Sequence, residues 1–188
     1  MPAVEREAMV REDAPEVDAV LQAAVREVQV HATEAGWDQP ARLYALVATS
    51  DLLAREPQLA AAMGLDAASA AGTLTPVEQD QMPPDRTLEQ ALAQMMWPAE
   101  VFGCAAVVER FVLPPGADTH MPEEPDAAQE YAASHPDRHE VRMVAGATRD
   151  GATYCTLRLR SHDDDQSVIE STDLVPVLLQ LLLDTLEH

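Results

Sequence analysis

The chain has 188 residues, 47% of them hydrophobic, and its 33 acidic residues outnumber its 12 basic residues to give a formal net charge of −21. This charge repels nucleic-acid phosphates and anionic membrane surfaces, so we expect neither as a partner. All the basic residues are arginine, and without lysine the chain has neither a Schiff-base amine nor the lysine of a phosphate-binding loop.

The first predicted element is a long helix. Apolar residues recur at helical spacing over residues 14–34, which is typical of a helix that buries one face. Asp13 is the expected cap, Pro15 suits the first turn, and Gly36 ends the element.

Short strands and helices follow in alternation. Residues 42–49, "RLYALVAT", predict a strand, and the alanine-rich residues 51–71 predict one or two short helices. Residues 73–80 predict an edge strand, because the proline within them cannot donate to a neighbouring strand on that side. Residues 86–97 predict another short helix.

The centre of the chain combines its strongest strand with a proline-rich segment. Residues 103–113, "GCAAVVERFVL", are apolar on both alternating faces at first, which favours a central strand covered on both sides. Residues 114–138 hold five prolines and six acidic residues, which predicts a mobile acidic loop.

Two strands and a helix complete the chain. Residues 139–148 and 152–160 predict strands, and residues 173–186 predict a helix. This order of elements predicts a single α+β domain over residues 1–188. We expect a mainly antiparallel sheet of about five strands, packed with the N- and C-terminal helices.

The turn between the last two strands sets their register. A two-residue loop would pair Val141 with Arg160 and mix apolar and charged groups on one face. A three-residue loop, Arg149 to Gly151, gives a wholly apolar face instead, and Gly151 supplies the left-handed residue of a bulged turn. We therefore predict that Val141 pairs with Leu159, Met143 with Leu157 and Ala145 with Cys155.

This register places arginines together on the other face of the hairpin. Arg142 lies opposite Arg158, and Arg160 lies opposite Glu140, so we predict an exposed patch of three guanidinium groups. Because like charges opposite each other destabilise a sheet, something must compensate them. One interpretation is internal pairing with Glu140, Glu109 or the acidic loop. The other is a site for an anion or an acidic peptide.

Two further features concern binding surfaces. Trp37 follows the first helix, where it either packs on the core or offers a platform for a peptide or ligand. Apolar residues surround the helix predicted at 173–186, so more than one side of it must be covered. The sheet covers one side, and either the helix at 14–34 or a second subunit covers another, which makes a homodimer one expected state.

The sequence offers no strong signal for catalysis. "HDDD" at 162–165 supplies ligand types for a metal, but its spacing fits no known motif, and we interpret it as a polar strand exit without a metal site. Ser161 and His162 are neighbours that would point to opposite faces of a strand. Cys104 and Cys155 are expected to be buried and reduced, and we expect no cofactor.

Three segments resemble a known family: "GWDQPARLYALV", "WPAEVFGCAAVVER" and "HPDRHEVRMVAGATRDGATYCTLRLRSHDDD". Together they are similar to an uncharacterised family of high-GC actinobacteria, from about Gly36 to the C-terminal helix. The resemblance implies a bacterial cytoplasmic protein, and the absence of an apolar N-terminal core agrees with that location. It implies no catalytic residue, because the family has no assigned activity.

Three functions remain open from the sequence. The first is a non-enzymatic cytoplasmic domain that binds a protein or peptide on an exposed apolar surface. The second is an enzyme or sensor with a concave anion pocket formed by Arg142, Arg158 and Arg160. The third is metal-dependent hydrolysis around His162 and the aspartates that follow it.

Overall fold

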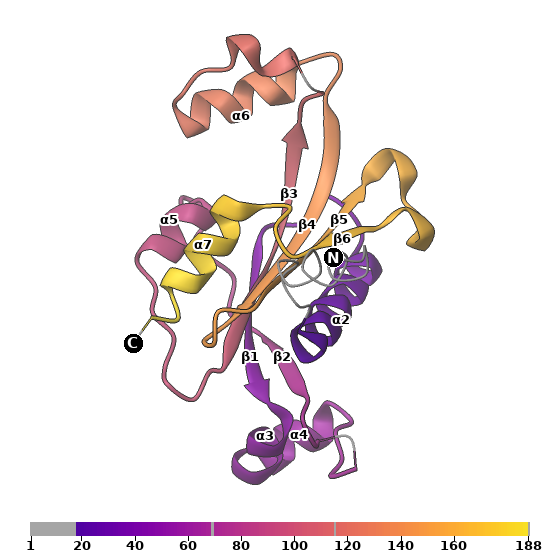
Figure 1. The fold of residues 1–188 in the computed structure, drawn as a ribbon, viewed down its shortest axis with the longest axis vertical. Coiled ribbons are helices and arrows are strands. Elements are labelled where there is room, and N and C mark those ends of the chain that lie inside the picture. Colours follow the sequence, from indigo (N-terminus) through magenta and orange to yellow (C-terminus); the bar gives the residue numbers. More distant parts are fainter. Residues whose placement is uncertain (1–17, 69, 115, 188) are drawn as a thin grey trace, which may run out of the picture.

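The computed structural model describes residues 18–68, 70–114 and 116–187, and it forms an antiparallel six-stranded sheet with helices on both faces (Figure 1). The predicted α+β class is therefore confirmed. The strand order is β2-β1-β3-β4-β5-β6. The strands are β1 (Arg42–Ala48), β2 (Leu74–Glu78), β3 (Gly103–Val112), β4 (His139–Thr148), β5 (Thr153–Leu159) and β6 (Ile169–Ser171).

Helix α2 (Ala19–Ala35) covers one face of the sheet. Its N-cap is Asp18, whose carboxylate accepts hydrogen bonds from the Val20 and Leu21 backbone N–H groups. The predicted cap Asp13 and first-turn Pro15 lie outside the described residues. The buried stripe of α2 follows the predicted helical spacing and consists of Leu21, Ala24, Val25, Val28 and Ala32.

Helices α5 (Leu88–Ala93) and α7 (Pro176–Asp184) cover the opposite face. A capping box between Thr87 and Gln90 starts α5. Helix α7 begins three residues later than predicted, because Pro176 suits only the first turn of a helix. The sheet and α5 cover α7. Helix α2, which the sequence offered as a second cover, lies on the other face.

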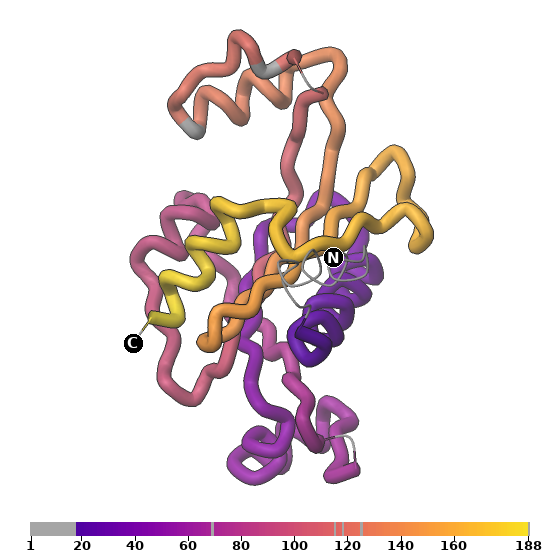
Figure 2. The backbone as a smooth tube through the Cα atoms, viewed as in Figure 1, coloured from indigo at the N-terminus to yellow at the C-terminus, as the bar shows by residue number. Residues whose placement is uncertain are grey.

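The acidic segment 114–138 is not a continuous loop. It contains a short 3₁₀ turn (Ala117–His120) and helix α6 (Pro125–Ser134). Proline is tolerated at the first position of α6, and the helix buries Ala132, which is only 3% exposed. The backbone trace runs along β3 out to α6 and returns along β4 (Figure 2). Mobility of this segment stays a prediction.

The predicted register of the β4–β5 hairpin is confirmed. Val141 pairs with Leu159, Met143 with Leu157 and Ala145 with Cys155. Gly151 has a φ of 90°, in the left-handed region that a bulged turn requires. The same ladder places Arg142 directly opposite Arg158.

The remaining described elements are peripheral to this arrangement. Helices α3 (Thr49–Arg55) and α4 (Pro57–Ala62) follow β1 at one end of the sheet. Throughout the described ranges, no helix has both the length and the apolar character required to cross a bilayer.

The packing of α2 on the sheet depends on the absence of a side chain at Gly146. A Cβ atom there would lie 2.6 Å from Val25 Cγ2 and 3.2 Å from Leu21 Cδ1. We predict that Gly146→Ala lowers the free energy of unfolding by about 1–3 kcal/mol through overpacking. Urea denaturation measures this loss, and the loss should be smaller in a Val25→Ala background. An equal loss in both backgrounds would contradict this placement of α2.

Candidate functional site

The arginine cluster, defined as Trp37, Arg142, Arg158 and Arg160, forms where β4 and β5 pass the end of α2. Arg142 and Arg158 are each only 3% exposed, so the prediction of an exposed patch of three guanidinium groups is wrong for these two. The segment after α2, which lies more than a hundred residues earlier in the chain, contacts Arg142, and the segment after β5 pairs with Arg158. Only the Arg160 side chain, at 40%, is well exposed.

Glu109 holds the segment that covers Arg142. Its two carboxylate oxygens accept hydrogen bonds from the backbone N–H groups of Asp38 and Gln39, at 2.7 and 2.8 Å. Asp38 has a φ of 65°, which aspartate tolerates better than most residues. Glu109 was one predicted partner for the arginines. Its negative charge does favour the charged form of Arg142, which it faces across β3 and β4, and its hydrogen bonds also fix the turn that carries Trp37.

Arg142 contacts the ring of Trp37. Its guanidinium carbon lies 4.3 Å from the ring centroid, a cation–π distance, and Nη2 donates to the Gly36 carbonyl at 2.7 Å. Nη1 is buried and has no hydrogen-bond partner. Burial lowers the pKa of Arg142, because removing a charge from water disfavours the charged form.

Arg158 binds the segment that follows β5. Nη1 donates to Asp163 Oδ1 at 2.8 Å and Nη2 donates to Asp165 Oδ1, while Nε is buried without a partner. Trp37 Nε1 donates to Asp163 Oδ2 at 3.0 Å. Hydrogen bonds from Arg158 and then from Trp37 lower the pKa of Asp163. The "HDDD" segment therefore does more than end a strand, since two of its carboxylates pair with a buried cation.

Arg160 completes the cluster at its exposed end. It donates to both carboxylate oxygens of Asp38, at 2.8 and 3.0 Å, and to Glu140 at 2.9 Å. Internal pairing was one of the two interpretations from the sequence, and Glu140 was a named partner. Asp38, Asp163 and Asp165 were not named, because no local pattern links them to the arginines.

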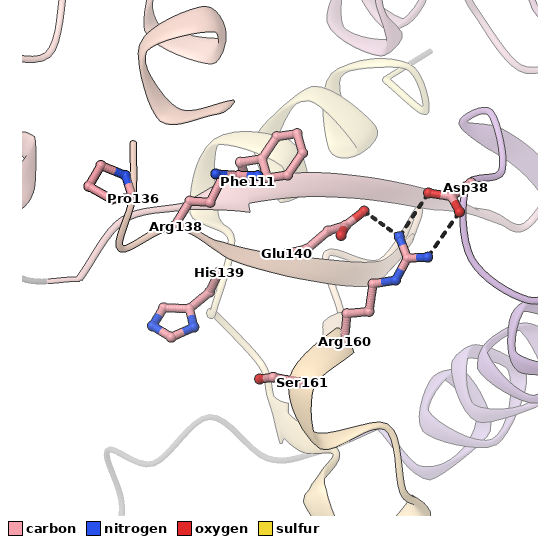
Figure 3. Close-up of a pocket in the computed structure, with 8 residues that line it drawn as sticks. All are labelled: Asp38, Phe111, Pro136, Arg138, His139, Glu140, Arg160 and Ser161. Carbon is pink, nitrogen blue, oxygen red and sulfur yellow. Dashed lines mark hydrogen bonds and ion pairs between the residues drawn. The ribbon is translucent and has the colours of Figure 1, made fainter. Parts of the chain in front are cut away.

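A cavity of about 660 Å³ opens beside Arg160 (Figure 3). Arg142 and Arg158 do not line it, so this cavity is not the concave pocket that the anion hypothesis required from all three arginines. Figure 3 shows Arg160 directed toward Asp38 and Glu140, with Phe111 and Arg138 along the strand ends. The lining residues are Asp38, Phe111, Pro136, Arg138, His139, Glu140, Arg160 and Ser161.

A second cavity, of about 310 Å³, lies on the opposite face and is called here the α6–α7 groove. Strands β3 and β4 provide its floor, α6 contributes Gln129, and α7 contributes a row of apolar side chains. Val177 is 74% exposed. The lining residues are Glu89, Val108, Arg110, Phe111, Val112, Gln129, Met143, Val175, Pro176, Val177, Leu178 and Leu181.

The remaining reactive groups offer little chemistry. Cys104 and Cys155 are free and buried, as predicted, and burial raises the pKa of Cys104 to about 11, so its thiol stays protonated near neutral pH. Ser161 Oγ lies 3.1 Å from His162 Nδ1. The expectation that they point apart is wrong, because they belong to a 3₁₀ turn. No group of three or more metal-ligating side chains occurs in the part of the chain that the structure describes.

Comparison with known proteins gives a family but no activity. The family described as PPA1309-like protein matches residues 21–187, so the chain belongs to it. It is an uncharacterised family named after a gene of Propionibacterium acnes, an actinobacterium. No curated protein and no solved structure matches the chain.

The pairing of Asp163 with Arg158 predicts a pH-dependent contribution to stability. Because the folded-state pKa of Asp163 is lowered, its contribution is present above the unfolded value of about 3.9 and is lost as pH falls through the folded value. Asp163→Asn should therefore destabilise the protein near neutral pH and have a diminishing effect below about pH 4.

Urea denaturation across this pH range measures the effect. Asp164→Asn is the matched control, because Asp164 accepts a hydrogen bond from Ser167 rather than from an arginine. The ion pair between Asp163 and Arg158 would be contradicted if Asp163→Asn destabilised the protein equally at every pH. It would also be contradicted if the control variant showed the same pH dependence.

Proposed function

We propose that this member of the PPA1309-like protein family is a non-enzymatic protein that binds a segment of another protein in the α6–α7 groove. The observation that carries the proposal is the groove itself, an apolar-lined cavity of about 310 Å³ beside the exposed Val177. A concave apolar surface with few polar groups is typical of sites that receive apolar side chains.

The lining of the groove supports apolar anchors. Val108, Val112 and Met143 come from the strands, and Val177 and Leu181 come from α7. Burying one valine, leucine or methionine side chain contributes about 1.5–3 kcal/mol. Two or three anchors therefore supply enough gross energy for a transient complex, from which the entropy cost of association is subtracted.

Charge favours a basic partner. The chain carries a net charge of −21. Helix α6, which contributes Gln129 to the groove, also has an exposed N-cap, Glu124, and exposed Asp126 and Glu130. A second copy of the chain would bring the same negative charge, whereas a basic segment would be attracted. The proposed occupant is therefore a basic amphipathic helix of another protein, with its apolar side chains in the groove.

The cellular setting is part of the same proposal. Free, buried thiols at Cys104 and Cys155 suit the reducing cytoplasm. The exclusive use of arginine among basic residues suits a high-GC genome, and together with the family name it supports an actinobacterial source.

Designed peptides test the groove. A leucine–arginine amphipathic peptide of about 15 residues should bind, and its leucine–glutamate counterpart and an alanine–arginine version should not. Val177→Asp should weaken binding of the first peptide by about tenfold or more, because it places a charge among the apolar anchors. Fluorescence anisotropy at physiological salt measures these affinities.

Val30→Asp is the matched control, because Val30 is 52% exposed on α2, which covers the other face. Equal weakening by both variants would mean that the peptide does not depend on the groove for binding, and the proposal would fail. It would also fail if the free chain sediments as a dimer that Val177→Asp dissociates, since the occupant would then be a second copy.

A further inference from the structure

The buried arginines have more hydrogen-bond donors than the described acceptors fill. Arg142 Nη1 and Arg158 Nε are both buried and lack partners. Buried polar groups are almost always hydrogen-bonded, and an unpaired N–H group in the interior is costly. Arg142 and Arg158 therefore keep hydrogen-bonding capacity that the described residues do not fill.

The carboxylates that do bind Arg158 come from an exposed segment. The Asp163 side chain is 41% exposed and that of Asp165 is 94% exposed, whereas Arg158 is 3% exposed. The 3₁₀ turns on either side, Arg160–His162 and Asp165–Ser167, contain no buried residue. Moving Asp163 and Asp165 away from Arg158 would uncover little apolar surface. Another anion could therefore take their place at the arginine cluster at a small cost in free energy.

The occupied part of the arginine cluster has the donor number and charge that suit a phosphate group. Three donors, Arg158 Nη1, Arg158 Nη2 and Trp37 Nε1, bind oxygens of Asp163 and Asp165. A phosphate monoester carries about −1.5 to −2 charge and three acceptor oxygens. One phosphate group therefore has about the same negative charge as the two carboxylates and enough oxygens to accept from all three donors. Replacing the carboxylates at these donors by phosphate changes the charge beside Arg158 very little.

We infer that the arginine cluster is a binding site for a phosphate-class oxyanion, and that Asp163 and Asp165 occupy it as an internal substitute. The planar fork of arginine suits bidentate binding of phosphate. The proposal is independent of the α6–α7 groove, which lies on the opposite face of the sheet. It also differs from the open cavity beside Arg160, because the ligand contacts Arg158 and Trp37.

Competition within the chain makes the site self-inhibited. A short tether gives the internal carboxylates an effective concentration of about millimolar. The wild-type chain therefore binds phosphate weakly, and removing the two carboxylate charges raises its affinity. The gain in affinity for phosphate depends on Arg158, because Arg158 provides two of the three donors that the carboxylates release.

Calorimetric titration with inorganic phosphate tests the inference at constant ionic strength. Asp163→Asn with Asp165→Asn should bind phosphate about tenfold or more tightly than the wild type. The matched control is Asp164→Asn with Asp173→Asn, which removes the same charge from two carboxylates that accept hydrogen bonds from serines rather than from an arginine. It should bind no more tightly than the wild type. Adding Arg158→Gln to the first pair should abolish the gain.

A second ligand identifies the source of the phosphate. A phosphoserine peptide that binds the double variant much more tightly than inorganic phosphate, while its unphosphorylated form does not bind, assigns the site to a phosphorylated partner. Equal binding of peptide and inorganic phosphate assigns it to the free ion. Should the double variant fail to fold, Asp165→Asn alone serves, because that side chain is almost fully exposed.

Two results would overturn the inference. One is an affinity for phosphate in the double variant no higher than in the matched control, which would leave the arginines as purely structural ion pairs. The other is a gain in affinity that survives Arg158→Gln, because the phosphate would then bind elsewhere.

Discussion

The burial of two guanidinium groups side by side is the constraint on which much of this structure depends. Arg142 and Arg158 face each other on β4 and β5 and are almost completely covered. A buried charge is tolerated only where partners replace water. Those partners come from the turn after α2, which brings Trp37, and from the segment after β5, which brings Asp163. The cluster therefore fixes segments far apart in sequence against one pair of strands.

The two faces of the sheet consequently have different characters. On the face covered by α2, apolar packing gives way along the strands to the charged arginine cluster. On the other face, α5 and α7 pack on an apolar core, and the α6–α7 groove lies beyond them. The basic segment proposed as a partner would meet the groove on one face, while the buried cations on the other face are shielded from solvent.

The sequence predicted the local and periodic features. Alternation of apolar residues, together with Gly151, was enough to set the β4–β5 register and so to bring Arg142 and Arg158 together. It did not predict their burial, because Arg142 is covered by a turn that Glu109 holds from a different strand, and Arg158 pairs with carboxylates of the segment after β5. Strand β6 was missed because its three residues are too few to show a pattern. Helix α6 was missed because the prolines and acidic residues of its segment are typical of a loop.

The most direct test of the buried cluster is the nuclear magnetic resonance of its guanidinium groups. In arginine-labelled protein at neutral pH, Arg142 and Arg158 should give separate Nη–H signals, because stacking and ion pairing hinder rotation of each group and burial slows exchange with water. Arg55, which is exposed on α3, provides the internal comparison. Averaged, rapidly exchanging signals from Arg142 and Arg158, indistinguishable from those of exposed arginines, would contradict the account.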